Sequence, residues 1–112
     1  MTQPHTHPSP AAAQYHLAGL EFLVSGQVED AVRWLRYAVD LDPRCASAWN
    51  DLGVILEALG NTRDAIYCYR RALQARPGMD EPRRNLLALA VQGAARPLIP
   101  PAGSRAAVAA AR

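Results

Sequence analysis

Residues 46–79 read ASAWNDLGVILEALGNTRDAIYCYRRALQARPGM, and this stretch decides the fold. Apolar side chains recur every three to four residues on both sides of Gly60. That spacing is typical of amphipathic helices, whose ends are marked by glycine and proline. Gly60 interrupts the pattern and Pro77 follows it. The stretch therefore predicts two helices joined by a short turn.

The same pattern occurs once more, 34 residues earlier, over residues 12–45. The two stretches share eight identical residues at matching positions, where this composition gives roughly three by chance. The identical pairs are Ala12 and Ala46, Gly19 and Gly53, Gly26 and Gly60, Asp30 and Asp64, Ala31 and Ala65, Arg36 and Arg70, Ala38 and Ala72, and Pro43 and Pro77. No stretch alternates with a period of two, so the sequence predicts helices without a sheet.

The paired stretches resemble the tetratricopeptide repeat, a 34-residue unit with the pattern W-x2-L-G-x2-Y, then A-x3-F, then P. In the first stretch Tyr15 replaces the tryptophan, and in the second Leu56 replaces the tyrosine. The residues that carry the resemblance are Tyr15, Gly19, Phe22, Ala31, Ala38, Pro43, Trp49, Leu52, Gly53, Ala65, Tyr69, Ala72 and Pro77. The resemblance implies an all-α helical-hairpin solenoid of two antiparallel helix pairs.

Small side chains mark where the two helices of a pair approach closely. Gly19 and Gly53 hold matching positions in the first helices, and a larger side chain there costs roughly 1–3 kcal/mol by overpacking. Gly26 and Gly60 end the first helix of each pair, where we expect a left-handed backbone conformation.

The prolines divide the chain into three parts. Residues 1–10 and 96–112 are proline-containing segments, expected to be a disordered leader and a flexible tail. Residues 11–95 form the predicted repeat domain, with repeats 12–45 and 46–79 and a single closing helix at 80–95. In the resembling family such a helix covers the exposed apolar face of the last pair.

The resemblance also implies a function, because the first helices of such repeats line a concave groove that binds peptides or partner helices. The groove positions in this sequence are His16, Leu20, Leu23, Asn50, Val54, Glu57, Arg84 and Ala88. One row is polar and the next apolar, which suits a short segment with one apolar edge. The alternative is that the apolar row packs between helices and the polar row is a solvated surface. A subfamily that clamps chaperone carboxylates does not fit, because His16, Leu20 and Asp51 replace its lysine and asparagines.

Two other functions stay open. Two repeats are fewer than usually make a stable stack, and apolar residues surround the segment 12–25, so the protein can be a homo-oligomer. It can also be an accessory subunit of a larger enzyme complex. Trp34 is expected to be half buried against the preceding helix; if it were exposed beside Tyr37, it would indicate a second contact surface.

Composition argues against other classes of function. Half of the 112 residues are apolar and the net charge is +2, which fits a globular domain and argues against a nucleic-acid partner. No apolar run is long enough to span a membrane. His5 and His7 lack a third metal ligand, and His16 lacks a carboxylate or cysteine one turn later. We expect no metal, cofactor or catalysis. Cys45 and Cys68 fit no disulfide framework, which favours the cytoplasm.

Overall fold

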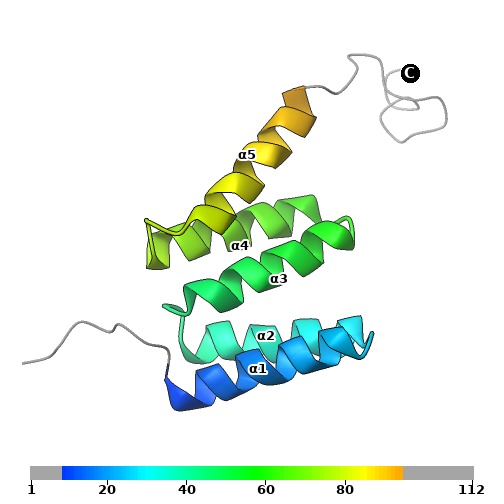
Figure 1. The fold of residues 1–112 in the computed structure, drawn as a ribbon, viewed down its shortest axis with the longest axis vertical. Helices are drawn as coiled ribbons and strands as arrows, with labels where there is room; N and C mark the ends of the chain where they lie inside the picture. Colours follow the sequence, from blue (N-terminus) through cyan, green and yellow to red (C-terminus); the bar gives the residue numbers. More distant parts are fainter. Residues whose placement is uncertain (1–8, 95–112) are drawn as a thin grey trace, which may run out of the picture.

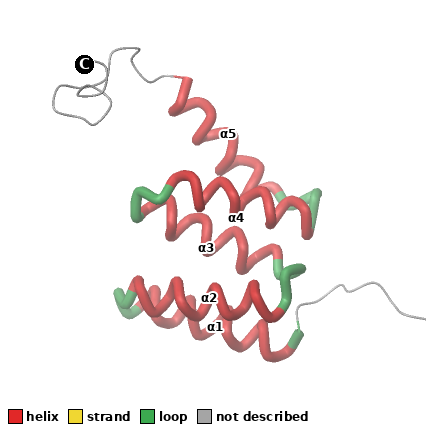
Figure 2. Tube along the Cα trace, turned by 180° about the vertical axis from the view of Figure 1, so that it is seen from behind, coloured by secondary structure: helices red, strands yellow, loops and turns green. Residues whose placement is uncertain are grey.

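The computed structural model describes residues 9–94, which form five α-helices. In chain order they are α1 (Pro10–Val24), α2 (Val28–Leu41), α3 (Ala46–Ala58), α4 (Thr62–Ala75) and α5 (Asp80–Ala94). Figure 1 shows α1 with α2, and α3 with α4, as two antiparallel pairs stacked on each other. Seen from behind in Figure 2, α2 and α4 lie in front of α1 and α3. The described residues contain no strand, and the predicted all-α helical-hairpin solenoid is confirmed.

Within each pair the helices touch at the predicted glycines. A Cβ atom added to Gly19 would lie 2.8 Å from Cγ of Leu35, and one added to Gly53 would lie 2.6 Å from Cε1 of Tyr69. Both distances are far below a normal carbon contact, so only glycine fits at these positions without movement of the neighbour. The repeated glycine thus sets the close approach of the first helix to the second in both pairs.

The turn inside each pair uses a glycine in the left-handed region. Gly26 has φ of 81° and Gly60 has φ of 85°. In each turn the next backbone N–H donates back to the first helix, from Gln27 to Phe22 at 2.9 Å and from Asn61 to Leu56 at 2.8 Å. This is the helix-ending motif that glycine permits without steric cost.

The core is centred on the second pair. Its buried members are Ala31, Leu35, Ala38 and Val39 of α2, Cys45 in the following loop, Ala48, Trp49, Leu52, Ile55 and Leu56 of α3, and Ala65, Cys68, Tyr69 and Ala72 of α4. Trp49 is 8% exposed, and its Nε1–H donates to the carbonyl oxygen of Pro43 at 2.9 Å. The tryptophan therefore packs the core and also anchors the loop between the pairs.

α1 begins at Pro10, two residues before the start that the periodicity predicts. Proline suits the first turn because its missing N–H has no partner there. Ser9 caps the helix, with its Oγ accepting from the N–H of Ala12 at 3.1 Å. The buried carboxylate of Asp42 accepts from the N–H of Ser9 at 2.8 Å and from that of Arg44 at 3.1 Å. Residue Asp42 thus joins the start of α1 to the loop after α2.

α5 packs against α4 through its first half and then extends away from the stack, as Figure 1 shows. Pro82 is fully buried, and Leu86 and Leu89 pack against the core. Leu87 and Val91 are 64% and 60% exposed. The predicted leader and tail lie mostly or wholly outside the described residues. No helix within residues 9–94 is long and apolar enough to cross a membrane.

Candidate functional site

The residues predicted to contact a partner lie on the first helices of the pairs and on α5. We call this side of α1, α3 and α5 the first-helix face. Its predicted members are His16, Leu20, Leu23, Asn50, Val54, Glu57, Arg84 and Ala88. Figure 1 shows α1 and α3 on the near side of their pairs, so residues from both repeats share this face.

The polar row at one edge of the face links neighbouring helices. His16 Nε2 lies 2.6 Å from Asp51 Oδ2, which joins α1 to α3. The hydrogen bond to Asp51 raises the pKa of His16 to about 9, helped by the Cys45 thiol and opposed by partial burial. The imidazole is therefore protonated near neutral pH, and the contact is an ion pair between the two repeats.

Asn50 is the buried member of this polar row, with only 2% of its surface exposed. Its Nδ2 donates to Glu81 Oε2 at 3.0 Å, and its Oδ1 accepts from Asn85 Nδ2 at 3.2 Å. Both partners belong to α5. The amide thus positions α5 on α3 and offers little surface to a ligand.

Sequence reasoning missed these contacts, although the sequence carries a signal for them. The His16–Asp51 and Asn50–Asn85 pairs are both separated by 35 residues, which is one repeat plus one residue. A search for polar pairs at this offset would find both. The contact is therefore a repeated feature that joins each first helix to the next.

The apolar row is more open than the polar row. Val54 is 46% exposed and Leu23 is 37% exposed, while Leu20 is partly buried. Arg84 and Ala88 of α5 are exposed. Glu57 accepts from the hydroxyl of Tyr69 at 2.7 Å. Burial raises the pKa of that hydroxyl, followed by the effect of the Glu57 hydrogen bond, so the tyrosine stays a neutral donor.

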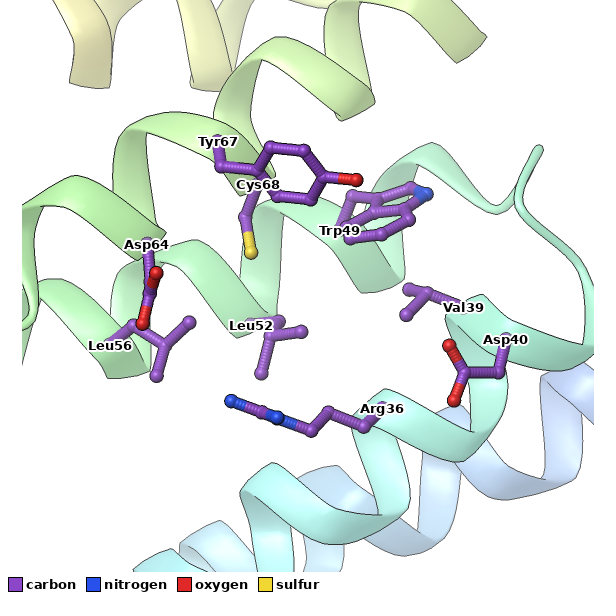
Figure 3. A pocket seen from close by; sticks show the side chains of 9 residues that line it. All are labelled: Arg36, Val39, Asp40, Trp49, Leu52, Leu56, Asp64, Tyr67 and Cys68. Carbon is purple, nitrogen blue, oxygen red and sulfur yellow. The ribbon is translucent and has the colours of Figure 1, made fainter.

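A cleft of about 400 Å³ lies away from this face, between α2 and the second pair. Its walls are formed by Arg36, Val39 and Asp40 of α2, Trp49, Leu52 and Leu56 of α3, and Asp64, Tyr67 and Cys68 of α4. Figure 3 shows Arg36 extending from α2 beneath Leu52. Burial raises the pKa of the Cys68 thiol to about 11, so it is neutral and a poor nucleophile.

Aromatic side chains gather at the outer end of the first pair. We call Tyr15, Phe22, Trp34 and Tyr37 the aromatic end patch. Trp34 lies 5.4 Å from Tyr15, 6.2 Å from Phe22 and 5.7 Å from Tyr37, measured between ring centroids. Trp34 is half buried, as predicted, and Tyr37 is 49% exposed. An open cavity of about 460 Å³ is lined by Tyr15, Trp34, Tyr37, Asp40 and Leu41.

The repeated helix pairs, the glycine contacts and the closing helix define a class: helical-hairpin repeat proteins, which present surfaces for other proteins. The sequence profile of the tetratricopeptide repeat matches residues 16–80. The chain belongs to the tetratricopeptide repeat family. This family and fold are typically non-catalytic and bind protein partners.

Two individual proteins resemble this chain. The uncharacterised protein MJ0572 of Methanocaldococcus jannaschii is 28% identical over 74 residues, which are 66% of this chain and 86% of that protein. The crystal structure of MamA matches with a TM-score of 0.69 and 24% identity, over 74% of this chain and 49% of MamA. The chain thus spans about half the length of the solved structure, and this likeness shows the fold alone.

Proposed function

We propose that the protein is a non-catalytic interaction module, an adaptor or assembly factor, whose first-helix face binds a peptide or a partner helix. The observation that carries the proposal is the exposed apolar row, in which Val54 and Leu23 are 46% and 37% exposed. A half-exposed Val54 argues against the alternative in which this row only packs between helices. The location we propose is the cytoplasm, supported by two free and buried cysteines.

The polar contacts support the same proposal in a different way. The His16–Asp51 and Asn50–Glu81 bonds join α1 to α3 and α3 to α5. Three helices held in fixed register form a preorganised surface, and preorganisation lowers the entropic cost of binding. The exposed Arg84 adds a charged anchor at the α5 end of the face. A ligand with an apolar edge and an acidic end fits this arrangement.

A pull-down from native lysate, with mass spectrometry of the captured proteins, tests the proposal. The bait variants are Val54→Asp and Arg84→Glu, and circular dichroism checks that each variant is folded. Leu59→Asp is the matched control, because Leu59 is 52% exposed at the end of α3 and outside the face. We expect partners captured by the wild type and the control to be lost from both variants. Partners retained by both variants would contradict binding at this face.

Self-association is a second candidate, favoured by apolar side chains at both ends of the stack. Leu17 and Val24 of α1 are 58% and 89% exposed, and Leu87 and Val91 of α5 are 64% and 60% exposed. Monomeric proteins seldom leave such residues grouped in the open. Light scattering after gel filtration measures the molar mass directly. A monomer at tens of micromolar would refute this candidate.

A further inference from the structure

The aromatic end patch is a binding surface apart from the first-helix face. Its cavity is lined by three aromatic rings, one leucine and the carboxylate of Asp40. Tyr37 and Leu41 are 49% and 51% exposed, so much of this apolar surface faces solvent. Within residues 9–94 Asp40 makes no ion pair, and no basic side chain lines the cavity. An aromatic surface beside a carboxylate favours a cation.

The second repeat shows how an equivalent surface is used. Trp49 matches Tyr15, and the guanidinium carbon of Arg71 lies 5.1 Å from the Trp49 ring centroid. The residue that matches Arg71 in the first repeat is Tyr37, whose ring lies 6.0 Å from Tyr15. The first repeat therefore keeps the aromatic surface and lacks the arginine that occupies it in the second.

The second repeat also shows which element covers this surface. α2 packs across the α3–α4 pair and brings Val39 and Arg36 to it, with Arg36 reaching along the cleft in Figure 3. The covering element is thus an amphipathic helix that carries apolar side chains and an arginine. No described helix takes this position on the first pair.

We propose that the aromatic end patch binds an arginine carried by an amphipathic helix of a partner protein. The guanidinium stacks on the Trp34 and Tyr37 rings and pairs with Asp40, while apolar side chains of the partner helix cover Leu41 and Tyr15. Arginine suits this site better than lysine because its planar group stacks on rings while its N–H groups bind a carboxylate. The rings of the patch touch one another, so the cation lies on their outer faces and not between them.

The test uses a peptide that copies α2, because α2 performs this role on the second repeat. The peptide has the sequence of residues 28–41 with Trp34→Ala and Tyr37→Ala, and it is acetylated and amidated at its ends. The matched control has citrulline, the neutral isostere of arginine, in place of Arg36. The protein is the full chain labelled with ¹⁵N, whose only two tryptophans give two indole signals. Trp34 reports on the patch, and the buried Trp49 serves as the internal reference.

We expect the arginine peptide to shift the Trp34 indole signal saturably, and the citrulline peptide to bind about fivefold more weakly. Asp40→Asn and Tyr37→Ala in the protein should each weaken binding about threefold or more, because both side chains are solvent-accessible contacts. Val54→Asp, on the first-helix face, should leave binding unchanged. This separates failure of the patch from failure of the proposed function.

Three results would overturn the proposal. The first is a Trp34 signal that does not move up to about 1 mM peptide, which corresponds to negligible affinity. The second is equal affinity for the arginine and citrulline peptides, which would mean apolar docking without a cation. The third is a shift of Trp49 with Trp34 unmoved, which would mean that the peptide binds elsewhere.

Discussion

Helices α1 and α3 hold the same place in their repeats, but their outward sides differ. On α3 three residues are buried where the helix packs toward α2: Ala48, Leu52 and Ile55, each at most 4% exposed. The matching residues of α1 are Gln14, Ala18 and Glu21, none of which is buried. One backbone can therefore serve as an inner or an outer layer of the stack, and a few side chains decide which.

The first way to break this comparison is to exchange residues at one matched position. Ile55→Glu puts a carboxylate into the core, and we expect it to cost about 4 kcal/mol or more, enough to unfold a small domain. Glu21→Ile makes the opposite change on an exposed position and should alter the free energy of unfolding by less than about 0.5 kcal/mol. Urea unfolding followed by circular dichroism measures both. Similar effects of the two changes would show that α1 and α3 have equivalent surroundings.

The second prediction compares the two polar contacts that are separated by 35 residues. His16–Asp51 can ionise, while Asn50–Asn85 cannot. The pKa of His16 is raised from 6.5 to about 9, so its stabilisation is complete below pH 6.5 and is lost as the pH rises through 9. We expect the free energy of unfolding to fall by about 3 kcal/mol over this range.

Urea unfolding at several pH values between 6 and 10 measures this slope. Asp51→Asn should flatten it, because the imidazole then loses its charged partner. Asn85→Ala should lower the free energy of unfolding at every pH and leave the slope unchanged. A slope that persists in Asp51→Asn would assign the pH dependence to another group.

The smallest effects are expected at the two close glycines. Gly53→Ala places a methyl group 2.6 Å from the fully buried Tyr69 ring, which the Glu57 hydrogen bond holds in place. Gly19→Ala meets a Leu35 side chain with more rotational freedom, at 2.8 Å. After the gain in helix propensity, we expect costs of about 2 and about 1 kcal/mol. Thermal unfolding compares them, and a reversed order would mean that Leu35 is the more rigid neighbour.

The sequence was sufficient to predict the helix pairs, because Gly19 and Gly53 recur in register and each helix has a clear apolar period. Gly26 and Gly60 also adopt the predicted left-handed conformation. These features are local, or are repeated at a constant interval. Both kinds of information can be read from one chain without knowledge of its packing.

The candidate site was predicted less completely, because exposure depends on contacts between repeats. A donor such as Asn50 is equally compatible with an open surface and with a bond to α5, and the structure buries it at 2% exposure. The start of α1 was missed because Ser9 is capped in part through Asp42, which is 33 residues away. The amphipathic period gave no indication of either contact.

The carboxylate of Asp42 has a consequence for how the first pair opens. It holds the N–H groups of Ser9 and Arg44, which flank the whole first pair. Fraying of α1 at its first turn therefore also releases the loop after α2, and the two ends cannot open independently. In native-state hydrogen exchange the amides at both ends should exchange with similar opening free energies, so that the pair behaves as one cooperative unit.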